Sequence, residues 1–315
     1  MVKYTFLLPA YKPDFFEVAL RSIKSQTFKD FKVLVSDDCS PHDLKSIYNK
    51  VCGDDTRFSF RRNEVNIGSK SLVSHWNLLV DMCDTEYLIL ASDDDVYEPT
   101  FLEEVDKLAQ KYPEVDLIRA RVRLINDSSN IAFYDGIYQE FTDSLEFVNL
   151  MYLHNSIKCI ANYTFRLKAL KAIEGFIDFP LAWFSDRATV MKLSTHGVAN
   201  TKDVLFSFRM SDVNITFGKN DEKKAYTKEY ATQLYDQWFK DFMETFEKQK
   251  NSKNAYQRGL YFSAIGEHNK LIKDEIVRYL PNLSFRHFGK YLKKIDPRLF
   301  KFYCLLVYIK TKIKG

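Results

Sequence analysis

Three adjacent carboxylates, Asp93, Asp94 and Asp95, have the clearest chemical potential in this chain. They follow Tyr87–Leu90, a short apolar run of β-forming residues that predicts a buried strand. Like charges at one strand end repel one another, so the folded chain must hydrate them or supply a cation. Hard divalent ions such as Mg²⁺ or Mn²⁺ take carboxylate oxygens and keep positions for water and phosphate. This acidic run therefore predicts a metal site, with a solvated turn as the alternative.

Two further strand ends carry residues suited to a nucleotide. Pro9, Ala10 and Tyr11 end the first predicted strand and can hold a base or ribose, unless they are an ordinary strand terminus. Asp37 and Asp38 end the second predicted strand, where carboxylates can accept hydrogen bonds from base and ribose. The alternative for this pair is a cap on the next helix.

A third loop, Asn63 to Gly68, leads into a predicted helix. Gly68 permits a tight turn, and Asn66 can reach either a ligand or the loop itself. A plain connecting loop is the alternative. The three loops follow consecutive strands, and the carboxyl ends of parallel strands share one edge of a sheet. We therefore expect them to meet the acidic run at that edge.

The elements that must position these residues alternate through the first 126 residues, which requires a parallel sheet with helical crossovers. The expected strands are Val2–Leu8, Phe31–Val35, Phe58–Arg61, Tyr87–Leu90 and Val115–Leu124, and the expected helices are Phe15–Ser25, Leu44–Val51, Lys70–Met82 and Thr100–Lys111. Beyond Asn126 the pattern predicts a hairpin, helices over Ser144–Leu153 and Leu181–His196, and strands over Cys159–Phe165 and Val204–Met210. Helices are expected over Lys224–Lys248, Ala255–Lys273 and Phe285–Lys312.

Composition narrows the class of protein. The 315 residues are 46% hydrophobic and 28% charged, as in a soluble globular protein. Five cysteines without metal-ligand spacing favour a reducing compartment over a disulfide framework or structural zinc. We see neither a signal peptide nor a membrane span and expect a cytoplasmic protein.

The net charge of +4 is unevenly distributed. Residues 285–315 contain nine Lys/Arg and one Asp, so the preceding 284 residues carry a net charge of −4. This argues against a nucleic-acid-binding face on the main domain. The tail interleaves its cations with aromatic side chains, which suits the surface of an anionic bilayer. A helix packed on its own domain, with lysines reaching to solvent, is the alternative.

The order of these motifs resembles the family-2 inverting glycosyltransferases of the GT-A fold over roughly residues 1–216. The resemblance implies an α/β fold with a mostly parallel central sheet, flanking helices and a C-terminal helical extension. It implies a GT-A domain over 1–218, with a nucleotide-sugar half (1–126) and an acceptor half (127–218). Residues 219–315 would form the helical region with its basic aromatic tail.

The same resemblance implies roles for the strand-end acids. Asp37 and Asp38 would contact the nucleoside. The family's Asp-x-Asp motif, aligned on Pro99, begins at Ser92 here and ends at Asp94, so which two of the three acids touch metal stays open. We expect Mn²⁺ or Mg²⁺ on Asp94 and Asp95 and donor contact by Asp93. Donor-binding residues are otherwise expected to be Pro9, Ala10, Tyr11, Asn66, Gly68 and Arg209.

Two later segments complete the resemblance. Gly175 to Arg187 matches the family's segment that opens a helix and carries the general base, which places that role on Asp186. A carboxylate must take the acceptor's proton in a direct displacement; a helix-dipole acid is the alternative. Trp183 would stack on an acceptor sugar or pack in the core. Arg209 would clamp the donor phosphate or form a surface salt bridge, and the loop Ser211–Lys219 would order as a lid.

The resulting hypothesis is an inverting, metal-dependent glycosyltransferase. It would move a sugar from a nucleotide-diphosphate donor, expected to be UDP-linked, to a glycan or lipid-linked glycan in bacterial capsule or lipopolysaccharide synthesis. Expected associations are peripheral membrane contact through 285–315 at the inner face of the cytoplasmic membrane, and a homodimer. A nucleotidyltransferase is disfavoured because Pro9–Pro13 lacks the glycine of a phosphate loop. A non-catalytic sugar-nucleotide-binding scaffold would lack the acidic run or Asp186, and both are present.

Overall fold

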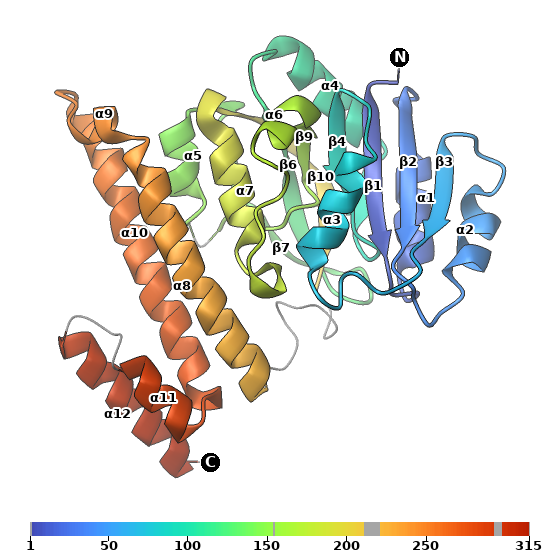
Figure 1. Cartoon of the computed structure of the whole chain (residues 1–315). Coiled ribbons are helices and arrows are strands. Elements are labelled where there is room, and N and C mark those ends of the chain that lie inside the picture. The colour runs from blue at the N-terminus through green and yellow to red at the C-terminus, as the bar shows by residue number, and fades with distance from the viewer. Residues whose placement is uncertain (1, 154, 211–220, 293–297, 315) are drawn as a thin grey trace. The chain divides into compact units, whose positions relative to one another are not determined.

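The computed structural model describes residues 2–153, 155–210, 221–292 and 298–314 (Figure 1). The chain forms two compact units. The sheet unit comprises Met1–Asp178 and Ser185–Ser211, and the helical unit comprises Phe179–Phe184 and Asp212–Gly315. The assignment of a nucleotide half and an acceptor half remains a prediction.

The sheet unit is built on a mixed sheet of ten strands in the order β3-β2-β1-β4-β9-β6-β10-β5, with β7 beside β6 and β8 beside β10. The longest pairings, β1 with β2 and β6 with β10, are parallel, whereas β9 is antiparallel to both of its neighbours. This is the α/β arrangement expected for a GT-A fold. The strands are β1 Tyr4–Ala10, β2 Phe31–Asp37, β3 Phe58–Arg62, β4 Tyr87–Leu90, β5 Val96–Tyr97, β6 Leu117–Ile125, β7 Ile131–Tyr134, β8 Phe141–Thr142, β9 Tyr163–Arg166 and β10 Val198–Arg209.

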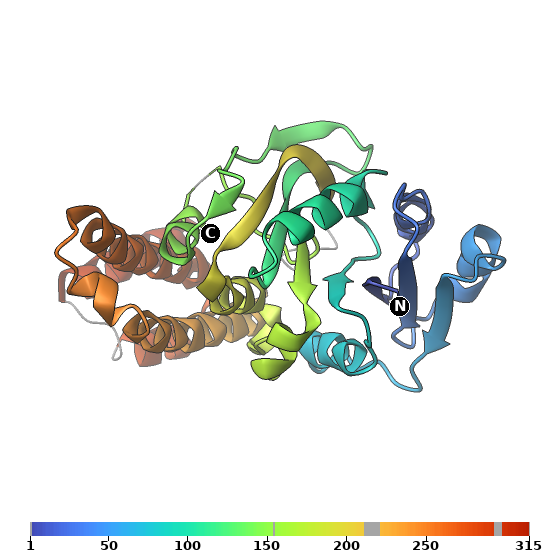
Figure 2. The ribbon, with the colours of Figure 1, turned by 90° about the horizontal axis from the view of Figure 1, so that it is seen from above.

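Helices cover both faces of this sheet (Figure 2). One face carries α1 Phe16–Lys24, α2 Leu44–Cys52 and α4 Phe101–Lys111, and the other carries α3 Leu72–Asp81, α6 Leu167–Ala172 and α7 Ser185–Leu193; α5 spans Ser144–Leu150. Helix α1 buries Phe16, Leu20 and Ile23, whose three- and four-residue spacing places them on one side of the helix.

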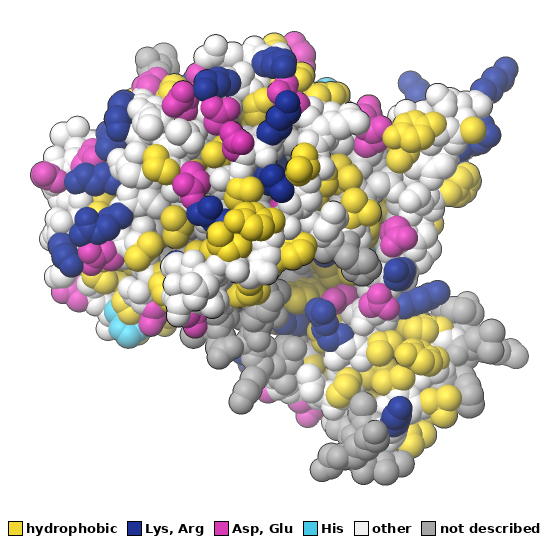
Figure 3. Space-filling view, turned by 180° about the vertical axis from the view of Figure 1, so that it is seen from behind, with side chains coloured by type: hydrophobic (Ala, Val, Ile, Leu, Met, Phe, Trp, Pro, Cys, Tyr) yellow, Lys and Arg dark blue, Asp and Glu magenta, His cyan; other side chains and the backbone are white. Residues whose placement is uncertain are grey.

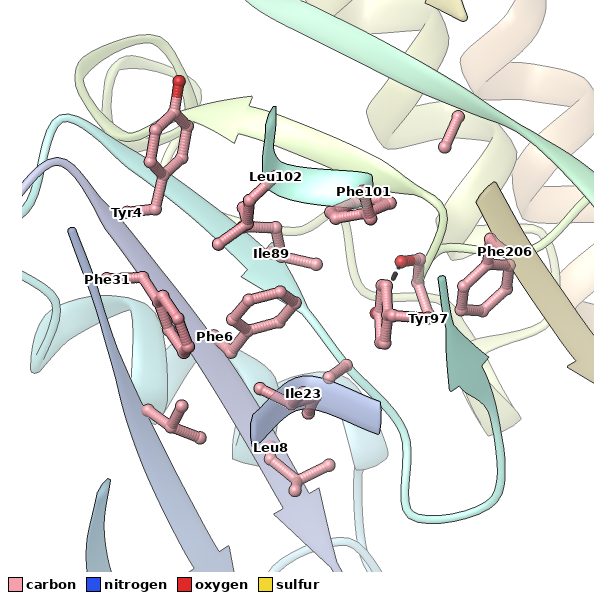
Figure 4. Close-up of a cluster of buried hydrophobic side chains, with 14 of the residues drawn as sticks. Tyr4, Phe6, Leu8, Ile23, Phe31, Ile89, Tyr97, Phe101, Leu102 and Phe206 are labelled. Atoms are coloured by element: carbon pink, nitrogen blue, oxygen red, sulfur yellow. Dashed lines mark hydrogen bonds between the residues drawn. The ribbon is translucent and has the colours of Figure 1, made fainter. Parts of the chain in front are cut away.

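An aromatic cluster fills the space between the sheet and this first helical layer (Figure 4). Phe6 of β1 meets Tyr97 and Phe101 edge-on or tilted, with ring centroids 5.1 Å and 6.2 Å away. The Tyr97 hydroxyl donates a hydrogen bond to the Ala161 carbonyl over 2.7 Å, so its polar atom is satisfied within the core. The cluster fixes the short strand β5, which directly follows the acidic run.

The prediction of one helix over Leu181–His196 is wrong. The chain instead forms the 3₁₀ turn η1 Pro180–Ala182, then α7, then the turn η2 Ser194–His196. Leu181, Ala182 and Phe184 have φ angles of 61°, 53° and 69°. A right-handed helix cannot continue through positive φ, which costs non-glycine residues roughly 1–2 kcal/mol each. The break makes Asp186 a first-turn residue of a new helix.

The helical unit contains long helices and, in the described parts of the segment predicted as helix over Phe285–Lys312, two C-terminal helices. Aromatic rings hold its middle together: Tyr235 stacks on Phe184, and Phe239 stacks on His268, with centroids 4.5 Å and 3.8 Å apart. Among the helices described, none is long and apolar enough to cross a membrane. The elements are α8 Glu222–Glu244, α9 Glu247–Lys250, α10 Ala255–Tyr279, η3 Leu280–Asn282, α11 Phe285–Leu292 and α12 Arg298–Lys314.

Position 175 requires glycine because of its positive φ angle and its close contact with Asn77. Its φ is +92°, and a Cβ there would lie 2.5 Å from Asn77 Oδ1. The Asn77 amide accepts the Phe176 N–H over 2.7 Å and donates to the Phe176 carbonyl over 3.0 Å. Asn77 therefore fixes the turn that leads towards Asp186.

We predict that Gly175→Ala destabilises the sheet unit by about 1–3 kcal/mol, the usual cost of a strained backbone residue. The matched control is Gly259→Ala in α10, where a new Cβ meets no atom within 4 Å. That change is expected to stabilise its helix by about 1 kcal/mol. Thermal unfolding followed by circular dichroism compares the two, and a Gly175→Ala variant as stable as the parent would contradict the assignment.

Candidate active site

The strand ends that carry the candidate residues lie along one edge of the sheet. Ala10 pairs with Asp37 at the ends of β1 and β2, and Ile125 pairs with Arg209 at the ends of β6 and β10. The acidic run follows β4, which is parallel to β1. The structure therefore gathers the predicted donor-binding residues and the predicted metal ligands at the carboxyl edge, where open α/β sheets bind ligands.

The acidic run is almost entirely buried, with 6% of Asp93, 6% of Asp94 and 2% of Asp95 exposed. Asp93 Oδ2 accepts the backbone N–H groups of Tyr11 and Lys12 over 2.8 Å and 2.7 Å. This pair of bonds ties the end of β1 to the acidic run. A solvated acidic turn, the alternative considered from sequence, does not describe these side chains.

Ser92 joins the other two acids. Its hydroxyl oxygen lies 2.8 Å from Asp94 Oδ1 and 2.6 Å from Asp95 Oδ2. A hydroxyl has one proton to donate, so both contacts are satisfied together when one carboxyl is itself protonated. Burial and the charge of Asp94 raise the pKa of Asp95 to about 8, which agrees with that arrangement. Ser92 was noticed in the sequence only as the place of a missing Asp.

The ammonium of Lys12 approaches the acidic run. Lys12 Nζ forms an ion pair with Asp94 Oδ2 and lies 3.5 Å from Asp93 Oδ1. Burial lowers the pKa of Lys12, but the charges of Asp93 and Asp94 outweigh it and raise the pKa overall. Lys12 was assigned no role from sequence, although it lies between Tyr11 and Pro13, directly after the first predicted strand.

The donor set of the acidic run fits a hard divalent ion. Carboxylate and hydroxyl oxygens are the ligands that Mg²⁺ and Mn²⁺ prefer, and the Lys12 ammonium shows that a cation is accommodated there. In the part of the chain that the structure describes, no three His, Cys, Asp or Glu side chains converge as a ready-made metal site.

Arg209 is a buried cross-link. Its side chain is 1% exposed in total, which excludes the surface salt bridge considered from sequence. Nε donates to the Asp94 carbonyl and Nη1 to the Asn126 carbonyl, each over 2.9 Å, while the guanidinium lies 4.0 Å from the Phe15 ring centroid. The Arg209 backbone N–H also donates to Asp95 Oδ1 over 2.9 Å. Arg209 thus fixes the backbone of the acidic run, and its contact with a donor phosphate remains a prediction.

Asp37 and Asp38 each organise a loop. Asp37 accepts the Ser40 N–H over 2.8 Å and forms an ion pair with Arg62. Asp38 accepts the Asn63 amide over 2.8 Å and the Gly68 N–H over 2.7 Å. These contacts hold the loops that follow β2 and β3 in place beside the end of β1.

Gly68 and Asn66 complete the second of these loops. A Cβ at Gly68 would lie 2.9 Å from Asp38 Oδ2, so glycine permits the close approach of the carboxylate to the backbone. Asn66 Oδ1 accepts the Ser69 N–H over 2.7 Å. The predicted roles of Asp37, Asp38, Asn66 and Gly68 in donor binding remain predictions, now with a loop-shaping role beside them.

Asp186 stands in the first turn of α7 and is partly buried. Its Oδ1 accepts the Arg187 N–H over 2.7 Å. Burial raises the pKa of Asp186, opposed by the charges of Arg187 and Lys158. A carboxyl whose pKa is raised towards neutrality is better suited to accept a proton than an ordinary aspartate.

Cys159 relates this acid to the acidic run. Burial raises the pKa of its thiol well above the usual value, and the charges of both Asp95 and Asp186 contribute in the same direction. Both carboxylates therefore lie within electrostatic range of one buried thiol inside the sheet unit.

Lys158 was not singled out from sequence, yet its charge opposes the raised pKa of Asp186. The pKa of Lys158 is lowered to about 7 by burial and by the charge of Arg187. We predict that Lys158→Met moves the acid limb of the rate–pH profile to higher pH. The reason is that removing a positive charge leaves the raised pKa of Asp186 less opposed.

The profile of kcat/KM against pH, measured on donor hydrolysis with water as acceptor, checks this shift. The control is Lys168→Met on α6, an exposed lysine of the same unit. An unchanged acid limb in Lys158→Met would show that the two groups are not coupled.

Trp183 belongs to the helical unit. Its ring lies edge-on to Tyr279, with centroids 6.4 Å apart, and Lys228 Nζ lies 4.1 Å from its centroid. It therefore packs within that unit, and its contact with an acceptor sugar remains a prediction. The lid predicted over Ser211–Lys219 lies outside the described residues.

Comparison with known proteins gives the family. The profile described as "Glycosyl transferase family 2" matches residues 5–173, more than half of the chain. This chain belongs to that family. The matched region contains almost all of β1, the acidic run and most of the sheet.

The relatives found differ in what they cover. A Campylobacter jejuni protein named GalNAc(5)-diNAcBac-PP-undecaprenol beta-1,3-glucosyltransferase is 30% identical over 96 residues, which are 30% of each chain. Staphylococcus aureus TarS 1–349, solved with UDP-GlcNAc, has a TM-score of 0.62 at 14% identity and covers 98% of this chain and 89% of its own.

The mannosyltransferase PcManGT from Pyrobaculum calidifontis, solved with GDP-Man and Mn²⁺, has a TM-score of 0.54 at 13% identity. It covers 98% of this chain and 86% of its own. At these identities the two structures support the fold of this glycosyltransferase and no finer assignment.

Proposed function

We propose that this glycosyltransferase is an inverting, metal-dependent enzyme that transfers a sugar from a UDP-linked donor to a lipid-linked glycan. The observation that carries the proposal is the buried acidic run at the carboxyl edge of the sheet, which Asp93 ties to the end of β1 through the N–H groups of Tyr11 and Lys12. The C. jejuni relative is named for an undecaprenol-linked acceptor, and TarS binds UDP-GlcNAc, which supports these substrate classes.

In this proposal each residue has one task. Asp94 and Asp95 hold Mn²⁺ or Mg²⁺, whose charge stabilises the departing diphosphate when it is bound. Tyr11 and the two loops that follow β2 and β3, which contain Asp37, Asp38, Asn66 and Gly68, hold the nucleoside. The Asp186 carboxylate takes the proton of the acceptor hydroxyl as that oxygen bonds to the anomeric carbon. The bond from that carbon to the diphosphate oxygen breaks in the same step, which inverts the configuration.

Calorimetric titration tests the donor class. UDP and GDP are each titrated into the full chain in Mn²⁺ and in EDTA. Binding of UDP that requires Mn²⁺ is the expected result. Tighter binding of GDP would reassign the base, and no binding of either nucleotide would overturn the proposed donor.

We extend the proposal to an anionic membrane surface. On α12 the side chains of Tyr303, Leu306 and Ile309 are 52%, 49% and 45% exposed, next to lysines. Hydrophobic side chains gather over the α11–α12 end of the chain in Figure 3. Apolar side chains interleaved with cations suit the headgroup region of a bilayer and a lipid-linked acceptor. Flotation with phosphatidylglycerol vesicles should carry the protein, whereas Leu306→Asp should remain behind.

A further inference from the structure

We propose that Lys12 is a resident counter-ion of Asp94 that excludes unaccompanied divalent ions and pairs with the diphosphate once a nucleotide binds. This inference rests on the proposed function, because it concerns the same acidic run. It assigns to Lys12 a positioning role that makes metal and nucleotide bind together.

The backbone of Lys12 is fixed, while its ammonium is at the surface of the site. Its N–H donates to Asp93 Oδ2 over 2.7 Å, and the following Pro13 restricts its backbone to an extended conformation. The side chain is 29% exposed, whereas those of Asp93 and Asp94 are each 8% exposed. A long stem with a fixed base can carry its charge between the acidic run and the solvent side without moving the strand.

Lys12 faces an oxygen that a metal ion would need. Asp94 Oδ1 and Asp95 Oδ2 are held by the Ser92 hydroxyl, and Asp95 Oδ1 accepts the Arg209 N–H. The remaining oxygen of Asp94, Oδ2, is paired with the Lys12 ammonium. A divalent ion on this oxygen would meet a like charge at close range, so the ammonium must leave before the ion can bind.

A nucleotide diphosphate reverses this balance. It brings negative charge to the solvent side of the acidic run and offers the displaced ammonium a phosphate partner. Lys12 therefore opposes the metal alone and favours metal and nucleotide together. Because linkage is reciprocal, the metal must raise the affinity for UDP by the same factor by which UDP raises the affinity for the metal.

The test measures binding of Mn²⁺ to the full chain by electron paramagnetic resonance, which reports free Mn²⁺, with and without UDP. In the absence of UDP we expect Lys12→Met to bind Mn²⁺ at least tenfold more tightly than the parent chain. We also expect the tightening by UDP to be smaller in Lys12→Met than in the parent. Lys12→Arg, which retains the charge, should behave more like the parent.

The matched control is Lys107→Met. Lys107 on α4 also pairs with two carboxylates, Glu103 at 3.1 Å and Glu104 at 2.7 Å, but lies on the exposed helix surface. Lys107→Met removes the same charge as Lys12→Met and should leave Mn²⁺ affinity unchanged.

Equal Mn²⁺ affinity in Lys12→Met and the parent would overturn the role of Lys12, while Mn²⁺-dependent UDP binding in the parent would leave the proposed function standing. Absence of that binding in the parent would overturn both. If Lys12→Met does not fold, the parent chain alone tests the inference. An Mn²⁺ affinity of the parent that UDP does not increase would exclude it.

Discussion

Asp186→Asn is expected to lower turnover by about 10²–10⁴-fold, the usual contribution of a general base, while leaving Mn²⁺-dependent UDP binding unchanged. The amide keeps the shape of the carboxylate and can still accept the Arg187 N–H that Asp186 accepts over 2.7 Å. It cannot take a proton from the acceptor hydroxyl. The measurement is the rate of donor hydrolysis or transfer together with calorimetric titration of UDP.

The stability of Asp186→Asn distinguishes a general base from an acid that serves only to stabilise the helix dipole. Burial raises the pKa of Asp186 in the folded chain, so ionising it lowers the stability of the fold as pH rises through that pKa. Asp186→Asn should therefore melt at the same or a higher temperature than the parent at neutral pH. If Asp186 instead served the helix dipole, neutralising it would lower the free energy of unfolding by about 0.3–1 kcal/mol.

Asp143→Asn provides the matched control. Asp143 is the N-cap of α5, where its side chain accepts the Leu145 N–H. The same chemical change at that helix start should leave turnover unaltered. If Asp186→Asn retains full turnover and loses stability, the general-base assignment is wrong.

The sequence was sufficient wherever a local pattern decides the structure. Helices α1 and α2 follow from apolar spacing, and β4 was predicted with its observed bounds, Tyr87–Leu90. The gathering of strand ends at one edge also follows, because parallel strands must finish together. These features depend on residues close in sequence and on a rule of sheet topology.

Long-range partners could not be obtained in this way. Strand β9 inserts antiparallel between β4 and β6, although its four residues carry no signal of direction. Leu181 and Phe184 adopt positive φ without being glycine, so an apolar helical pattern misled the prediction. Arg209 was expected from sequence to clamp the donor phosphate or form a surface salt bridge, yet its side chain is buried and donates to the Asp94 and Asn126 carbonyls. Tertiary contacts override local preference at each of these places.

Replacing Asp94 by asparagine is expected to weaken Mn²⁺-dependent binding of UDP by about 10–100-fold, the range typical of perturbed metal sites. The reason is geometric as well as electrostatic. Asp93 is committed through Oδ2 to the N–H groups of Tyr11 and Lys12, and Asp95 is committed to Ser92 and Arg209. Asp94 is the acid whose Oδ2 is paired with the Lys12 ammonium rather than with a backbone N–H.

Three variants test whether Asp94 contributes more to metal binding than Asp93. Asp94→Asn should lose the dependence of UDP affinity on Mn²⁺ and keep residual binding in EDTA. Asp93→Asn should change chain stability more than metal affinity, because its contacts hold the end of β1. Asp106→Asn on α4, which removes a carboxylate paired with Lys3 at 2.6 Å, controls for the loss of one charge elsewhere. Unaltered Mn²⁺ dependence in Asp94→Asn would exclude Asp94 as a ligand and direct attention to Asp95.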